Sequence, residues 1–115
     1  MKRRLVFSLG LFACLLFSAQ AFAIEYGDAT AGGQKFQEKG CTSCHGEGGR
    51  STTPTFPILA GQYDDYLVHA LTDYKNGHRK NPIMTGMAGG LSETDVYDIA
   101  AYLSGQQSSL VVLPR

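Results

Sequence analysis

The chain has 115 residues, of which 43% are hydrophobic, so it is long enough for one globular domain and too short for two ordinary ones. Ten basic and ten acidic residues give a formal net charge of zero, but three of the basic residues lie within the first four positions. Behind residue 23, seven basic residues face ten acidic ones, and this formal charge of −3 without any basic cluster argues against nucleic acid and anionic membrane surfaces as partners.

The N-terminal segment has the pattern of an export signal. Three basic residues at positions 2–4 precede an apolar run, and the run ends with Ala21-Phe22-Ala23, the small-x-small pattern that signal peptidase cleaves. We therefore expect residues 1–23 to be a signal peptide, residues 24–115 to form the mature domain, and this domain to be located in the periplasm.

Two other interpretations of the same segment remain open. Leu5 to Ile24 is about long enough to cross a bilayer if no cleavage takes place. Cleavage in front of Cys14 would produce a lipoprotein, but it would leave an apolar stretch at the new N-terminus. The Ala-x-Ala ending favours cleavage, after which no membrane contact is expected.

The first element behind the signal is a short predicted helix over residues 29–39. Phe36 lies at helical spacing from its neighbours there, and Gly40 is a natural C-terminal stop. Residues 46–57 follow with the sequence GEGGRSTTPTFP, which is too rich in glycine, serine, threonine and proline for a helix or a regular strand. A loop of this length in a small domain usually lines a site.

A second helix is predicted from an apolar stripe at helical spacing, which Gly77 ends. The stripe consists of Tyr63, Tyr66, Leu67, Ala70, Leu71 and Tyr74. The stretch from Asn76 to Gly90, NGHRKNPIMTGMAGG, again contains too much glycine and proline for regular structure, and we expect it to be irregular.

The last predicted helix begins at Ser92, whose hydroxyl is a good N-terminal cap, and it ends at Gly105. Asp95 lies in its first turn, where a negative charge is favourable. No useful strand-like alternation appears, so the predicted class is all-α with long loops. Such loops need something besides the apolar core to organise them.

The sequence Cys41-Thr42-Ser43-Cys44-His45 is the C-x-x-C-H pattern that attaches c-type haem. Each cysteine forms a thioether with a haem vinyl group, and the adjacent histidine is an axial iron ligand. A disulfide oxidoreductase, a structural zinc site or a plain disulfide are alternatives, but the chain has no βαβ context and no second close Cys/His pair. We therefore expect one covalent haem c with its iron.

A haem that only transfers electrons needs a second axial ligand, and a thioether raises its potential relative to two imidazoles. The candidates are Met84, Met87, His78 and His69. The two histidines suit an exposed position better, because His69 lies off the apolar stripe and His78 lies in a charged turn. The residues alone do not rank the two methionines.

Over about residues 27–106 the sequence resembles the class I cytochromes c. The resemblance rests on Gly33, Phe36, the motif at residues 41–45, Pro57 to Gln62, Met84, and Leu91 to Ser104. It implies a class I cytochrome c fold, in which three to four helices and their loops wrap around a covalently bound haem.

The resemblance also implies particular contacts. The first and last helices are expected to cross at close range, with Gly33 allowing the approach and with Phe36 and Tyr102 packing near the contact. The backbone carbonyl of Pro57, twelve residues past the histidine of the motif, is expected to accept the Nδ1–H of His45.

The greatest likeness is to each half of the bacterial dihaem cytochromes c, which have M-T-G-M in front of their last helix. The first methionine is the ligand there, so the resemblance assigns Met84 to the iron and leaves Met87 as the alternative. This chain has a single haem motif, so it is a monohaem protein that works alone or as a homodimer.

These features together predict a non-enzymatic single-electron carrier that meets redox donors and acceptors transiently. The alternative is a cytochrome subunit or haem sensor domain docked permanently on a larger redox enzyme. A peroxidase-like enzyme would need a distal pair, for which only His78 and Arg79 are available. The sequence leaves open whether residues 107–115, with four consecutive apolar side chains, pack on the domain or bind a neighbour.

Overall fold

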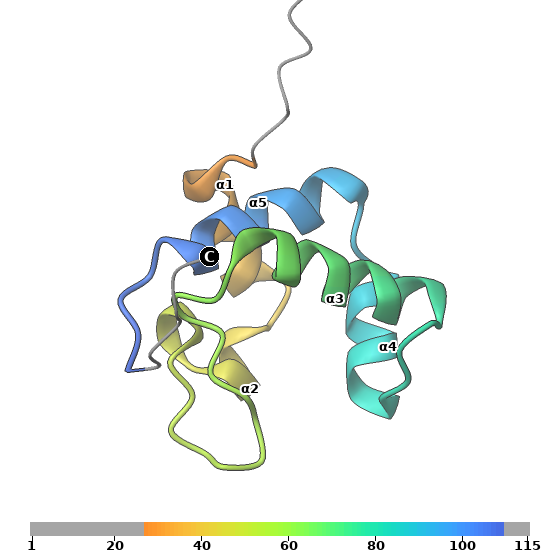
Figure 1. Ribbon diagram of the computed structural model, residues 1–115, viewed down its shortest axis with the longest axis horizontal. Helices are drawn as coiled ribbons and strands as arrows, with labels where there is room; N and C mark the ends of the chain where they lie inside the picture. Colours follow the sequence, from red (N-terminus) through yellow and green to blue (C-terminus); the bar gives the residue numbers. More distant parts are fainter. Residues whose placement is uncertain (1–26, 110–115) are drawn as a thin grey trace, which may run out of the picture.

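The computed structural model describes residues 27–109, so the predicted signal peptide and residues 110–115 lie outside the described part (Figure 1). The elements are α1 (Ala29–Glu38), α2 (Thr42–His45), the 3-10 turn η1 (Glu47–Gly49), α3 (Asp64–Asn76), α4 (Pro82–Gly89) and α5 (Glu93–Ser104). No strand occurs among residues 27–109, and the predicted all-α class is confirmed. None of the helices in this range has the length and apolar character needed to cross a bilayer.

The core forms where α5 lies between α1 and α3 (Figure 1). Phe36 of α1 and Leu103 of α5 are each 1% exposed, and Leu67 of α3 is 4% exposed. Val96 and Ile99 complete the buried side of α5. Each buried side chain of this size contributes about 1.5–3 kcal/mol, so this contact dominates the stability of the fold.

The crossing of α1 and α5 depends on small residues. A Cβ atom at Gly32 would lie 1.9 Å from the backbone oxygen of Asp98, so only glycine permits this approach. A Cβ atom at Gly33 would lie 3.0 Å from the ring of Tyr102, and the rings of Phe36 and Tyr102 are 5.8 Å apart. The expected crossing is confirmed, with Gly32 making the tighter contact that the resemblance did not assign.

An ionic network joins the same two helices. The Lys35 ammonium lies 2.6 Å from Oδ2 of Asp98 and 3.0 Å from Oδ1 of Asp95. The other oxygen of Asp98 accepts the backbone N–H of Asp28 at 2.7 Å. The hydrogen bond from Lys35 lowers the pKa of Asp98, so this nearly buried carboxylate is ionised at neutral pH.

The N-terminus of α5 is fixed by a capping box, as the sequence predicts. The Ser92 hydroxyl accepts the backbone N–H of Asp95 at 3.1 Å, and the Asp95 carboxylate accepts the backbone N–H of Ser92 at 3.0 Å. The backbone hydrogen bond from Ser92 lowers the pKa of Asp95 strongly. The cap therefore depends on a carboxylate that stays charged.

Helix α3 begins and ends where the apolar stripe predicts, with Gly77 in the left-handed conformation at φ +77°. Its buried side differs from the predicted stripe at one position, because Tyr66 is 47% exposed and its hydroxyl accepts a hydrogen bond from Arg79. Val68, outside the stripe, packs against the core instead.

The prediction of irregular backbone from Asn76 to Gly90 is wrong for α4. The Asn81 side chain accepts the backbone N–H groups of Ile83 and Met84 at 3.0 Å each, and Pro82 occupies the first helical turn, where its fixed φ is favourable. Ala88 on this helix is fully buried. The cap and the packing offset a cost of about 1 kcal/mol for a glycine inside the helix.

Candidate cofactor site

The C-x-x-C-H motif lies on α2, a single helical turn that follows α1 almost directly. Gly40 has φ +77°, which ends α1, and the Cys41 N–H donates to the Phe36 carbonyl at 3.1 Å. The His45 N–H then donates to the Cys41 carbonyl at 3.0 Å. This short turn holds both sulfur atoms and the imidazole in a fixed relation to the α1–α5 core.

Cys41 and Cys44 are free thiols, and both are half-buried. Burial raises the pKa of the Cys41 thiol above its ordinary value. A disulfide oxidoreductase instead needs an attacking cysteine with a lowered pKa, because the thiolate is the nucleophile. The raised pKa of Cys41 therefore disfavours it as the attacking thiolate of a disulfide oxidoreductase.

His45 is 6% exposed, and its Nδ1 lies 2.9 Å from the backbone oxygen of Pro57. A carbonyl oxygen only accepts, so the proton is on Nδ1, and Nε2 keeps a lone pair that suits a metal ion. Phe56 lies edge-on to the imidazole with ring centroids 6.4 Å apart. The expected contact between His45 and Pro57 is present, while its role toward an iron ion stays a prediction.

The loop that carries Pro57 folds back on the core through glycines that adopt positive φ. At Gly49, with φ +73°, the carbonyl accepts the N–H groups of Leu59 and Ala60 at 2.8 and 3.1 Å. A Cβ atom on Gly49 would lie 2.7 Å from the Leu103 side chain, so the loop packs closely on α5. This packing fixes the position of the Pro57 carbonyl beside His45.

Both candidate methionines lie on α4 rather than in a loop. Met84 is half-buried and Met87 is 38% exposed. The Asn81 side chain binds the Met84 N–H directly, so the N-terminal cap of α4 sets the position of this residue. In Figure 1, α2 and α4 lie toward opposite ends of α3 and on the same side of it.

Neither of the two other candidate ligands lies in a buried site. The side chains of His69 and His78 are 76% and 74% exposed, and both pair with Asp73, at 3.2 and 3.6 Å. The guanidinium of Arg79 lies 4.8 Å from the centroid of the Tyr74 ring on α3. His78 and Arg79, the distal pair that a peroxidase would need, thus contact Asp73 and Tyr74 of α3.

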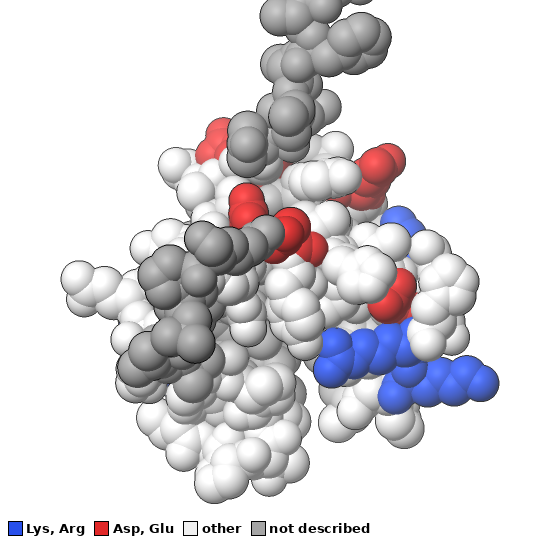
Figure 2. All heavy atoms as spheres, viewed as in Figure 1, with Lys and Arg blue, Asp and Glu red and all other residues white. Residues whose placement is uncertain are grey.

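The surface charge is distributed unevenly around this site. Figure 2 shows positive charge gathered at the turn between α3 and α4, where Arg79 and Lys80 are consecutive. Negative charge lies over the opposite end of α3, where Asp64 and Asp65 begin the helix. The methionine-bearing helix α4 therefore lies beside the positive end of the domain.

The donor set fits a covalently attached haem. Two thiols on one helical turn match the two vinyl groups, and a buried imidazole with a free Nε2 matches one axial position. The hydrogen bond from Nδ1 to the Pro57 carbonyl fixes the ring orientation and raises the basicity of that ligand.

Comparison with known proteins gives consistent results. The family model described as cytochrome c matches residues 29–107. Cytochrome c4 of Pseudomonas aeruginosa is 45% identical over 84 residues, which cover 73% of this chain and 41% of that protein. Cytochrome c-554(548) of Halomonas halodenitrificans is 44% identical over 84 residues, which cover 70% of this chain and 99% of that protein.

A similarity in three dimensions accompanies these matches. The solved structure of cytochrome c4 from Acidithiobacillus ferrooxidans has a TM-score of 0.60 and 36% identity to this chain, and the match covers 66% of this chain and 48% of the other. The chain thus spans about half the length of the cytochrome c4 relatives, but almost the full length of cytochrome c-554(548) corresponds to it.

Proposed function

The chain belongs to the cytochrome c family, and from that premise we propose that it is a periplasmic monohaem protein that carries single electrons between redox proteins. Membership of the family implies haem c with its iron, and the relatives are named cytochromes c, which are electron-transfer proteins and not enzymes. These matches show that the chain is a c-type cytochrome that carries electrons. The observation that carries the proposal in the structure is the buried His45, fixed by Pro57 beside two free thiols.

We assign the roles of the site residues as follows. Cys41 and Cys44 would hold the haem through two thioethers, and His45, which the Pro57 carbonyl orients through Nδ1, would bind the iron. Met84 would provide the other iron ligand, with Met87 as the alternative. The half-burial of Met84 and its direct contact with the Asn81 cap favour it over the more exposed Met87.

When bound, the haem iron supplies the one-electron couple. Two side chains bound to the iron would leave it no open position for a substrate, and the burial of His45 keeps water away from its imidazole. The thioether ligand favours the reduced state, so a potential above that of a bis-imidazole haem is expected.

The partners in this proposal are redox proteins that bind through small, short-lived interfaces. The positive turn at Arg79 and Lys80 beside α4 would orient such encounters by charge. The export pattern in residues 1–23 supports a periplasmic location. Because one relative of matching length also has 44% identity, we propose that the single haem domain functions without a covalent second half, alone or as a homodimer.

The experiment is a haem stoichiometry on protein exported in a host with a working haem-attachment system. We expect one haem per chain that resists acid extraction, and Cys41→Ala with Cys44→Ala should abolish it. Ser43→Ala, inside the same turn, is the matched control and should retain full attachment. Colourless wild-type protein would contradict the proposal. Purification as a stable complex with a larger enzyme would indicate a docked subunit instead of a free carrier.

A further inference from the structure

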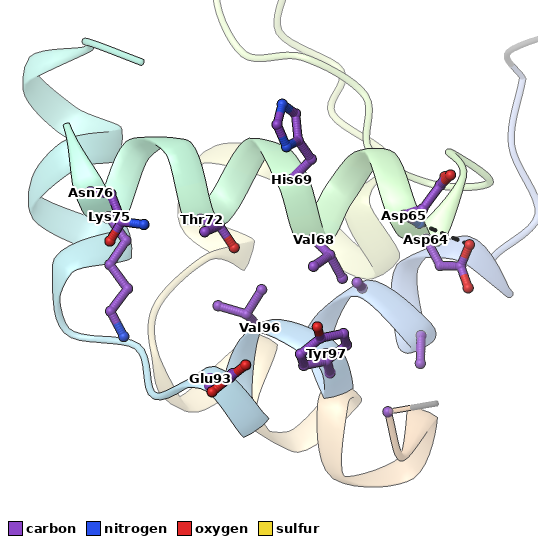
Figure 3. Close-up of a pocket in the computed structure, with 13 residues that line it drawn as sticks. Asp64, Asp65, Val68, His69, Thr72, Lys75, Asn76, Glu93, Val96 and Tyr97 are labelled. Atoms are coloured by element: carbon purple, nitrogen blue, oxygen red, sulfur yellow. Dashed lines mark hydrogen bonds between the residues drawn. The ribbon is translucent and has the colours of Figure 1, made fainter. Parts of the chain in front are cut away.

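A groove lies between α3 and α5, and no residue of the cofactor site lines it (Figure 3). Its volume is about 850 Å³. Val68 of α3 and Val96 of α5 lie at its centre with Tyr97 beside them, and Figure 3 shows these side chains facing one another across the groove. Tyr97 is 38% exposed although it lies over an apolar floor. Val96 itself is 2% exposed, so the apolar surface that a further segment could cover is that of Val68 and Tyr97, and polar residues such as Asp65 and Lys75 line the groove beside it.

We propose that the groove is the binding site of this chain's own segment Leu110-Val111-Val112-Leu113. These four consecutive apolar residues follow directly on the described chain, and left in water they would form an exposed apolar strip. An apolar groove within reach is the surface that this composition fits.

The place where the described chain ends supports this occupant. A Cβ atom on Gly61 would lie 2.8 Å from the Cβ atom of Ser108, and the Gly61 N–H donates to the Leu103 carbonyl at 2.9 Å. Gly61 comes three residues before Asp64, which begins α3 and lines one end of the groove. The chain behind Ser108 therefore starts beside that end.

The length of the segment matches the groove. The groove follows α3 from Asp64 to Asn76, a rise of about 18 Å at 1.5 Å per residue. Residues 110–113 in extended form reach about 13 Å. The segment is therefore long enough to cover most of the groove.

The competing segment on the N-terminal side is shorter. Gly27 also lines the groove, so residues 24–26 start close to it. These three residues, which are all that remains in front of Gly27 after the predicted cleavage, reach about 10 Å. They reach along about half of the groove and include the acidic Glu25, so length and composition favour residues 110–113.

The test uses methyl NMR of the reduced, full-length holoprotein. We expect nuclear Overhauser contacts between the methyl groups of residues 110–113 and those of Val68 and Val96. Contacts of Val68 and Val96 with Ile24 or Tyr26 instead would overturn the proposal. It would also be overturned if the contacts disappeared on dilution and sedimentation gave the mass of a dimer, because the segment in the groove would then belong to a second copy of the chain.

A pair of double variants provides an independent readout. Successive side chains of an extended segment point to opposite sides, so only one of two alternating pairs faces the groove. The two double variants are Leu110→Ser with Val112→Ser and Val111→Ser with Leu113→Ser. The variant that changes the pair facing the groove should lower Tm by about 5 °C or more, and the other should leave Tm nearly unchanged. Equal Tm values for both variants and the wild type would contradict docking. Haem content should stay at one per chain throughout, so failure here is distinct from failure of the proposed carrier function.

Discussion

Substituting alanine for glycine at three helical positions tests the α1–α5 crossing quantitatively. The gain in helix propensity is the same in each case, up to about 1 kcal/mol, so differences between the variants report the space around the new methyl group. At Gly32 the added Cβ atom would lie 1.9 Å from the Asp98 oxygen and 2.4 Å from its carbonyl carbon. At Gly33 the nearest atom is 3.0 Å away in the Tyr102 side chain, and at Gly86 nothing lies within 4 Å.

The Gly32→Ala variant has to separate two backbones. Ordinary contact begins at 3.4 Å, so α1 and α5 must move apart by about 1.5 Å, which loosens the packing of Phe36 on Tyr102. Overpacking a core typically costs about 1–3 kcal/mol, and two backbones yield less than side chains do. We expect about 3 kcal/mol of destabilisation, or about 12–24 °C in Tm for a domain of this size.

The assay is thermal unfolding of each holoprotein, followed by circular dichroism and by the Soret band. Gly86→Ala should equal or exceed the wild type in Tm, and Gly33→Ala should fall between the two because a side chain can move. If Gly32→Ala melted within a few degrees of Gly86→Ala, the close crossing of α1 and α5 would be refuted. Failure of Gly32→Ala alone to accumulate as holoprotein, with normal yields of the other two, would agree with the prediction.

Two further predictions concern the axial ligand and the ionic network. Met84→Ala should abolish the weak long-wavelength absorption band of an Fe(III)–thioether bond while Met87→Ala keeps it, and the reverse result would assign Met87 to the iron. Lys35 lowers the pKa of Asp98 in the folded protein. The ion pair therefore stabilises the folded protein at pH values above about 3.9, the pKa of an aspartate in the unfolded chain. This stabilisation is lost as the pH falls through the lower pKa of Asp98 in the folded protein. Asp98→Asn should therefore lower Tm at pH 7, with the difference from the wild type shrinking in melts below about pH 4; a difference independent of pH would contradict the ionised state of Asp98.

Local signals predicted much of the fold. The apolar stripe predicted α3, and Ser92 with Asp95 predicted the start of α5, because both signals act within one or two helical turns. The irregular backbone expected around Met84 is wrong because the N-terminal cap and the first-turn proline outweigh the helix-breaking effect of the glycines. Asn81 followed by Pro82 is a cap followed by a first-turn proline, and this pattern alone would have indicated α4.

Other features depend on contacts between distant segments. Tyr66 fits the apolar stripe, yet it is 47% exposed and its hydroxyl accepts a hydrogen bond from Arg79, which the periodicity of the sequence does not show. The tight approach at Gly32 exists only because Asp98 lies opposite, 66 positions later. The motif at residues 41–45 predicts haem attachment from sequence because its chemistry depends only on neighbouring residues. The choice between Met84 and Met87 as the iron ligand also depends on the position of α4.

The pairing of α1 with α5 has a consequence for biosynthesis. The Asp28 N–H and the Asp98 carboxylate that accepts it are seventy residues apart, so the central contact of the domain can form only when nearly the whole chain has been made. Until then the turn with Cys41 and Cys44, which directly follows α1, has no finished core to pack on. An incomplete chain thus leaves both sulfur atoms accessible, and the last helix completes the core beside them.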